Sequence, residues 1–193
     1  FDQTYINLAH ALALPVLRES EDNPLRPAVE LLERELQFKV LQMSGRFYIQ
    51  TESGNMEAHL VAEGLRKLAS ILYLILNGEI NANTILFWDE PEMNLNASHL
   101  PVLVKTLTGL AKTGVQVILS SHSLFLLREL MIQLSEPRNA MVQRKFFGMS
   151  VPRGDRSGVK VTWGESLEDV GPIESLEAEI EQADRYLKLS YES

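Results

Sequence analysis

The sequence contains no cysteine, no long apolar run and no glycine-rich phosphate-binding loop. The absence of cysteine excludes disulfides and thiolate metal sites, and it fits a reducing compartment. No apolar stretch approaches the roughly 18 residues of a membrane-spanning helix, and the first residues lack the pattern of a signal peptide. We therefore expect a cytoplasmic protein that does not contact a membrane.

Positive charge is also scarce. The 193 residues include 18 Lys and Arg against 26 Asp and Glu, which gives a formal net charge of −8. This balance argues against a general nucleic-acid-binding surface, although a local basic patch or a partner chain would still supply one. The local group Arg138, Arg144 and Lys145 fits such a patch or, as the alternative, a solvated face. The length and the 45% apolar content suit one domain, or a large part of one, with a buried core.

The sequence does contain a short apolar run that ends in two acids. Residues 85–88, Ile-Leu-Phe-Trp, are followed by Asp89, Glu90 and the strand-breaking Pro91. A short apolar run bounded by breakers predicts a buried parallel strand. Ligands of open α/β sheets bind at the carboxyl ends of such strands. Two carboxylates at this place suit a hydrated Mg²⁺ ion and a polarised water molecule.

A second apolar run, residues 115–119, ends in Ser120, Ser121 and His122. Between the two runs, residues 98–112 have the apolar spacing of an amphipathic helix, with Pro101 in its first turn. A strand, a helix and a strand predict a βαβ unit, so the acids and the histidine should reach one edge of a parallel sheet. The alternatives are acids that cap the next helix and a histidine that is hydrogen-bonded in the core.

Together, the two strand ends resemble the ABC-type ATPases, in the branch that includes SMC, RecF and the OLD-like bacterial ATPases. The pattern Asp-Glu-Pro-Glu-x-x-Leu at 89–95 is typical of that branch. The resemblance implies an α/β fold, namely the C-terminal lobe of a P-loop NTPase with a mainly parallel sheet, flanking helices and a small antiparallel hairpin. It also implies ATP and Mg²⁺ as cofactors. Asp89 would hold the water shell of Mg²⁺, Glu90 would be the general base, and His122 would contact the γ-phosphate.

The resemblance places the ABC signature loop at Ala62, Glu63 and Gly64, before a helix that ends near Gly78. In the family this loop reaches the γ-phosphate held by a second subunit. Ala62 stands where the family has serine, so the Gly64 N–H, the helix dipole and Arg66 or Lys67 would make the contact. The alternative is an ordinary helix with a glycine near its start.

Asn94 belongs to the stretch that corresponds to the family's D-loop, which crosses the dimer interface, or else to a plain turn before the next helix. We expect residues 1–59 to form a helical segment and a β-hairpin, with a polar loop at 51–55. Residues 60–134 would hold the signature, Walker B and switch-histidine core. Residues 135–193 would add edge strands, a mobile loop at 150–158 and a last helix with Leu176, Ile180, Ala183 and Leu187 facing inward.

The resemblance therefore implies an ATP-hydrolysing module that dimerises on nucleotide and gates a DNA-linked or anti-phage effector, such as a nuclease or toxin. The missing Gly-x-x-x-x-Gly-Lys-Ser/Thr loop would lie upstream of Phe1 or in another chain. The alternative is a non-hydrolysing scaffold clamped by nucleotide, which the missing hydroxyl at Ala62 favours. A serine hydrolase, a zinc protease and a nuclease are disfavoured, because no nucleophile elbow, His-Glu-x-x-His motif or acid cluster is evident.

Overall fold

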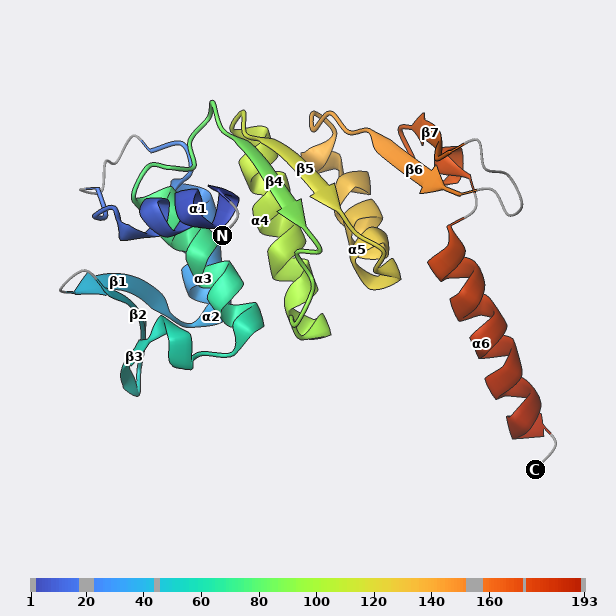
Figure 1. Ribbon diagram of the computed structural model, residues 1–193, viewed down its shortest axis with the longest axis horizontal. Helices are drawn as coiled ribbons and strands as arrows, with labels where there is room; N and C mark the ends of the chain where they lie inside the picture. Colours follow the sequence, from blue (N-terminus) through green and yellow to red (C-terminus); the bar gives the residue numbers. More distant parts are fainter. Residues whose placement is uncertain (1–2, 18–22, 44–45, 152–157, 172, 192–193) are drawn as a thin grey trace.

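The computed structural model describes residues 3–17, 23–43, 46–151, 158–171 and 173–191, and Figure 1 shows their arrangement. Helices are combined with one parallel strand pair and two antiparallel groups, which confirms the predicted α/β class. The bounds in chain order are α1 (Gln3–Ala13), α2 (Arg26–Leu36), β1 (Lys39–Met43), β2 (Arg46–Thr51), β3 (Gly54–Glu57), α3 (Glu63–Leu76), β4 (Ile85–Asp89), α4 (Leu100–Lys112), β5 (Gln116–Ser120), α5 (Leu124–Ser135), β6 (Phe146–Ser150), β7 (Lys160–Gly164) and α6 (Glu174–Tyr191). Within these ranges, no helix combines the length and apolar character needed to cross a membrane.

Strands β4 and β5 pair in parallel, as predicted, and α4 connects them. Their register runs from Ile85 opposite Gln116 to Asp89 opposite Ser120. After α4, Gly114 adopts a φ of 103°, a conformation that glycine reaches without a Cβ penalty and that lets the chain turn into β5. The consequence is that β4 and β5 end at the same edge.

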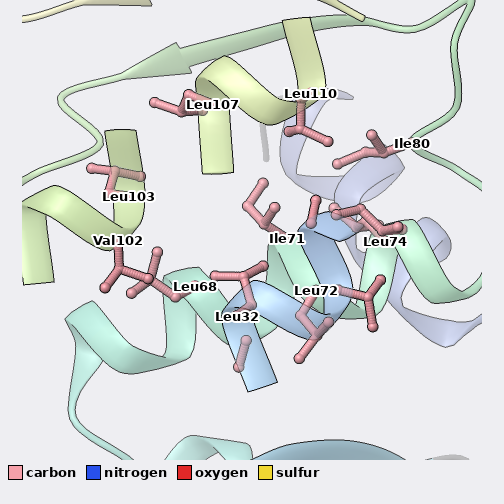
Figure 2. Packing of buried hydrophobic residues seen from close by; sticks show 14 of the residues in the cluster. Leu32, Leu68, Ile71, Leu72, Leu74, Ile80, Val102, Leu103, Leu107 and Leu110 are labelled. Carbon is pink, nitrogen blue, oxygen red and sulfur yellow. The ribbon is translucent and has the colours of Figure 1, made fainter. Parts of the chain in front are cut away.

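The core lies among α2, α3 and α4 (Figure 2). Leu32, Leu72, Leu103 and Leu110 are fully buried there, and each contributes about 1.5–3 kcal/mol by leaving water. The inner face of β4–β5, which includes Leu86, packs against the same cluster. Helix α3 and the β4–β5 pair are therefore held relative to each other by one core.

The β-hairpin predicted within residues 1–59 is formed by β1 and β2, which pair antiparallel. The prediction of a polar loop at 51–55 is wrong in part. Gly54 and Asn55 belong to a third strand, β3, which pairs with β2. A positive φ of 126° at Gly54 allows the tight reversal. The edge strands predicted within residues 135–193 are β6 and β7, which pair antiparallel. The loop expected to be mobile at 150–158 lies mostly outside the described residues.

The outer face of the β4–β5 pair is open, so the prediction of a fully buried strand is wrong on this side. Ile85 is 53% exposed, Phe87 72% and Ile118 40%. These three side chains alternate along the strands with the residues that face the core. An apolar run identifies a strand, but it does not show which faces the rest of the chain covers.

The last helix is also less buried than predicted. Ile180 and Leu187 are 54% and 50% exposed, and Ala183 is exposed, instead of facing inward. Figure 1 shows the reason, since α6 projects from the rest of the molecule. The side chain of Leu176 lies outside the described residues.

Candidate functional site

The carboxyl ends of β4 and β5 lie side by side (Figure 1). The residues at these two ends are polar. Asp89, the last residue of β4, is opposite Ser120, the last residue of β5. The Glu90 N–H donates to the Ser120 carbonyl oxygen at 2.9 Å, which extends the pairing by one residue. The residues that follow both strands therefore meet at one edge, where open α/β sheets bind ligands.

Glu90 and His122 are in direct contact at this edge. His122 Nδ1 lies 2.7 Å from Glu90 Oε1, a distance at which the imidazole N–H donates to the carboxylate. The Glu90 side chain is 29% exposed and the His122 side chain is 74% exposed. The carboxylate is thus partly sheltered and oriented by an imidazole that remains accessible to a ligand.

Two other acids at this edge accept hydrogen bonds from serine hydroxyls. Ser120 Oγ donates to Asp89 Oδ1, and Ser121 Oγ donates to Glu92 Oε1. The other Glu92 oxygen, Oε2, is buried and has no hydrogen-bond partner among the described residues. The sequence alone assigned no role to the two serines. Ser120 ends β5 and Ser121 follows it, and β5 is the strand that neighbours the acids; this position is the signal that would have identified both serines.

The loop formed by residues 90–95 follows β4 and has an uncommon backbone conformation. Glu90 has a φ of 43° and Asn94 a φ of 62°, both in the left-handed region that few non-glycine residues adopt. The Met93 N–H donates to the Glu90 carbonyl at 3.0 Å, which closes a turn within the loop. Backbone of this kind persists where the surroundings hold it, and it is concentrated at functional sites.

The predicted signature residues lie at the start of α3, against this loop. Ala62 is the exposed N-cap residue of α3 and makes no side-chain capping hydrogen bond. Glu63 Oε2 accepts from Asn94 Nδ2 at 2.7 Å. Gly64 is buried, and a Cβ there would lie 2.4 Å from the Asn94 carbonyl oxygen and 2.7 Å from Leu95 Cα. Close packing on the 90–95 loop is therefore a reason for glycine at this position that the sequence did not reveal.

The two cations of the first turns of α3 have different environments. Lys67 Nζ donates to the carbonyl oxygens of Met93 at 3.0 Å and Glu90 at 3.4 Å. Arg66 is half-buried, and its N–H donates to the Ala62 carbonyl at 3.0 Å within the helix. Lys67 thus contacts the main chain of the 90–95 loop, whereas the sequence suggested a phosphate contact for this side chain.

The basic group of residues 138–145 is used in local contacts. Arg144 donates to the Leu134 and Glu165 carbonyl oxygens, and Lys145 Nζ lies 3.7 Å from the centre of the Trp163 ring. Arg138 forms an ion pair with Glu136. These local contacts favour the alternative of a solvated face over a patch for nucleic acid.

The strand-end arrangement can position a water molecule for attack. Glu90 can accept a proton from water, Asp89 can hold a hydrated cation, and His122 can donate to an anionic ligand. Phosphoryl transfer depends mainly on positioning and charge neutralisation, and this set provides both without a covalent nucleophile. Among the described residues, no group of three or more His, Cys, Asp or Glu side chains is arranged to bind a metal directly.

Comparisons with known proteins identify a family and a shared fold. The family model described as "AAA domain, putative AbiEii toxin, Type IV TA system" matches residues 1–128. A search of curated proteins found no match. Among the solved structures that match, two serve as examples of the shared fold at low sequence identity. One comes from work on ATP-driven dimerization and DNA stimulated activation of SMC ATPases, with 10% identity, a TM-score of 0.53 and coverage of 94% of this chain and 96% of that chain.

The second of these solved structures is the Smc head domain with an extended coiled coil, bound to the C-terminal domain of ScpA, from Pyrococcus furiosus. It is 11% identical with a TM-score of 0.50, and the match covers 88% of this chain and 38% of that chain. At these identities the likeness concerns the fold, which is that of an SMC ATPase head.

Proposed function

This chain belongs to the AAA domain family described as a putative AbiEii toxin of a type IV TA system, and we propose that it is the catalytic lobe of a Mg²⁺-dependent ATPase. The observation that carries the proposal is the 2.7 Å contact between His122 and Glu90 at the carboxyl ends of neighbouring parallel strands. In this function Glu90 accepts the proton of the attacking water, and His122 orients Glu90 and contacts the γ-phosphate. The SMC-like fold supports the same assignment.

The residues at the strand ends fit a hydrated Mg²⁺ ion. Mg²⁺ takes oxygen ligands, keeps several of its waters and is usually bound through one or two carboxylates together with nucleotide phosphates. Asp89 is exposed at the end of β4 and would hold the water shell of the ion. When bound, the ion neutralises charge on the phosphates.

A nucleotide site of this class also needs a phosphate-binding loop, and none of its sequence pattern occurs in the 193 residues. We propose that a segment upstream or in another chain supplies it and packs on the open outer face of β4–β5. Parallel sheets are almost always covered on both faces, whereas Ile85, Phe87 and Ile118 leave this one open. Asp89 lies on the same face by strand alternation, so the docked segment would bring its phosphates toward this carboxylate.

Replacing Phe87 by alanine in the full-length protein tests this packing. If the face is covered, Phe87→Ala should lower the free energy of unfolding by about 3–5 kcal/mol, as for a core phenylalanine, although the residue is 72% exposed here. Urea denaturation measures the change. Met141→Ala, at a side chain 91% exposed, is the control and should change stability by less than about 0.5 kcal/mol. An equally small effect of Phe87→Ala would mean that the face stays open.

Phosphate release by the full-length protein tests the ATPase function. We expect hydrolysis of ATP with Mg²⁺, its loss with EDTA, and a strong decrease in the Asp89→Asn variant, because the amide cannot replace the charge that holds the hydrated ion. ATP binding is measured in parallel with a fluorescent nucleotide. A protein that binds no ATP, or that hydrolyses ATP equally well in EDTA, would contradict the proposal.

A non-hydrolysing, nucleotide-clamped scaffold is the second candidate, and Ala62 favours it. The exposed N-terminus of α3 lacks a side-chain hydroxyl at this residue, so one donor to a phosphate is missing. Phosphate release measured with and without DNA and the effector partner separates the two functions. ATP binding without release under every condition would favour the scaffold.

The last part of the proposed function is the association of two ATPase subunits. We propose that nucleotide binding joins two ATPase subunits, with Ala62, Glu63 and Asn94 on exposed segments that face the second subunit. We further propose that the dimer gates a nuclease or toxin effector, with DNA as a ligand of the full assembly. The AbiEii description and the ATP-driven dimerization of the SMC neighbour support this assignment. Light scattering with and without ATP would contradict it if the mass stayed that of one subunit.

A further inference from the structure

Lys67 lies one turn after the start of α3, and its side chain contacts the main chain of the 90–95 loop. Lys67 is half-buried as a residue, and its ammonium donates to the carbonyl oxygens of Met93 and Glu90, 26 and 23 residues further along the chain. No ion pair between Lys67 and a carboxylate is found in the part of the chain that the structure describes. The charge of this lysine is therefore used to hold backbone, and partial burial reduces its screening by salt.

The neighbouring residues of α3 reinforce this contact. Glu63 and Lys67 are four residues apart, the spacing of an ordinary helical ion pair, yet both turn to the loop. Glu63 accepts from the Asn94 amide, and Gly64 packs directly on the backbone of residues 94–95. One face of the first turns of α3 thus contacts the loop at both of its ends.

The loop needs such support because of its backbone. Glu90 and Asn94 both have positive φ, and residues of this kind keep that conformation only where neighbours over-determine it. Lys67 contacts the carbonyl of one of them, and Glu63 contacts the side chain of the other. The direction of the Glu90 carboxylate toward His122 depends on this backbone, since the side chain starts from the strained residue itself.

We propose that Lys67 is a positioning residue that fixes the main chain of Glu90 and Met93, and that it couples the N-terminus of α3 to the Glu90 carboxylate. Contact of a nucleotide or a second subunit with residues 62–64 then changes the direction of the general base through a rigid connection. The inference rests on the proposed ATPase function of Glu90.

The test uses the full-length protein with Lys67→Met, which keeps an apolar stem but removes the ammonium. We expect kcat for Mg²⁺-ATP to fall about 10- to 100-fold, as for a misplaced catalytic group, with KM little changed. Lys67→Arg should recover part of kcat, because its guanidinium can donate to both carbonyls. The matched control is Lys105→Met, which removes another half-buried lysine from the middle of helix α4 and should leave kcat unchanged.

Amide hydrogen exchange gives a second readout that does not depend on turnover. The N–H groups of Glu90, Met93 and Leu95 are hydrogen-bonded in the native loop. In Lys67→Met their exchange should accelerate, while amides of α4 and α5 keep their wild-type rates. Wild-type loop exchange and wild-type kcat in Lys67→Met, with Glu90→Gln inactive, would overturn the role of Lys67 alone.

Two further results, one from hydrogen exchange and one from the Glu90→Gln variant, would also overturn the proposed role of Lys67. Faster exchange throughout α3, α4 and α5 would mean general destabilisation and would also overturn the positioning role. Full turnover in Glu90→Gln would remove the proposed function of Glu90, and with it the coupling of Lys67 to catalysis, whatever the exchange of the loop shows.

Discussion

Glu90→Gln in the full-length protein is expected to bind ATP like the wild type and to hydrolyse it about 10²–10⁴-fold more slowly, the usual contribution of a general base. The amide has nearly the same shape as the carboxylate, so the fold and the nucleotide site should persist. It cannot accept the proton of the attacking water, and it loses the charge that interacts with the His122 imidazole 2.7 Å away. Steady-state phosphate release and equilibrium binding of ATP measure the two quantities separately.

Glu30→Gln is the matched control, because Glu30 is also a carboxylate paired with a cation, Arg26 Nε at 2.9 Å, on the exposed surface of α2. Loss of that pair should leave turnover unchanged, since exposed ion pairs contribute at most about 1 kcal/mol. If Glu90→Gln hydrolyses ATP at the wild-type rate, Glu90 is not the general base. Loss of ATP binding together with turnover would also contradict the assignment, because it would give the carboxylate a role in binding.

Gly64→Ala is expected to destabilise the protein by about 1–3 kcal/mol, the usual cost of overpacking a buried site. The added Cβ would lie 2.4 Å from the Asn94 carbonyl oxygen and 2.7 Å from Leu95 Cα, and both are backbone atoms that no rotamer change can move away. Either α3 or the 90–95 loop must shift. Because the loop begins at Glu90, the variant should also lose most of its ATPase activity, and urea denaturation and phosphate release measure the two effects.

Gly109→Ala is the matched control for Gly64→Ala, because the added Cβ has free space within the described part of the chain. Gly109 also lies within a helix, α4, but a Cβ there meets nothing within 4 Å among the described residues. Alanine is the better helix former by about 1 kcal/mol, so Gly109→Ala should stabilise the protein and keep its activity. If the two alanine variants behave alike, the packing of Gly64 on the loop is not what requires glycine at this position.

Local signals in the sequence were sufficient for most of the elements. The apolar spacing at 98–112 predicted α4, and the helix expected after Gly64 is α3. Ser123 precedes α5 and caps it, since its Oγ accepts from the Leu126 N–H. The apolar runs at 85–88 and 115–119 match β4 and β5 to within one residue at each end, and the parallel pairing followed from the intervening helix. Each of these features depends on residues within a few positions of one another, so the sequence displays them directly.

Burial was predicted less well, because it depends on what the rest of the chain covers. The same apolar spacing marks a helix stripe inside the core, as at Leu103 in α4, and an exposed stripe, as at Ile180 in α6. Likewise, the run that forms β4 places Leu86 on the core and Phe87 in the open. Periodicity defines a face, but only the packing of distant segments decides whether that face is covered.

The sequence by itself determined the fold class, the two strands and the polar residues at their ends, because period, breakers and caps act over short range. It also gave the order of the acid pair and the histidine along the chain. Only the tertiary structure decided that His122 contacts Glu90 and that Gly64 packs on Asn94. It also decided that the Lys67 ammonium donates to carbonyl oxygens of the 90–95 loop. These contacts join residues more than 20 positions apart, and they exist because one core sets α3, β4 and β5 against each other.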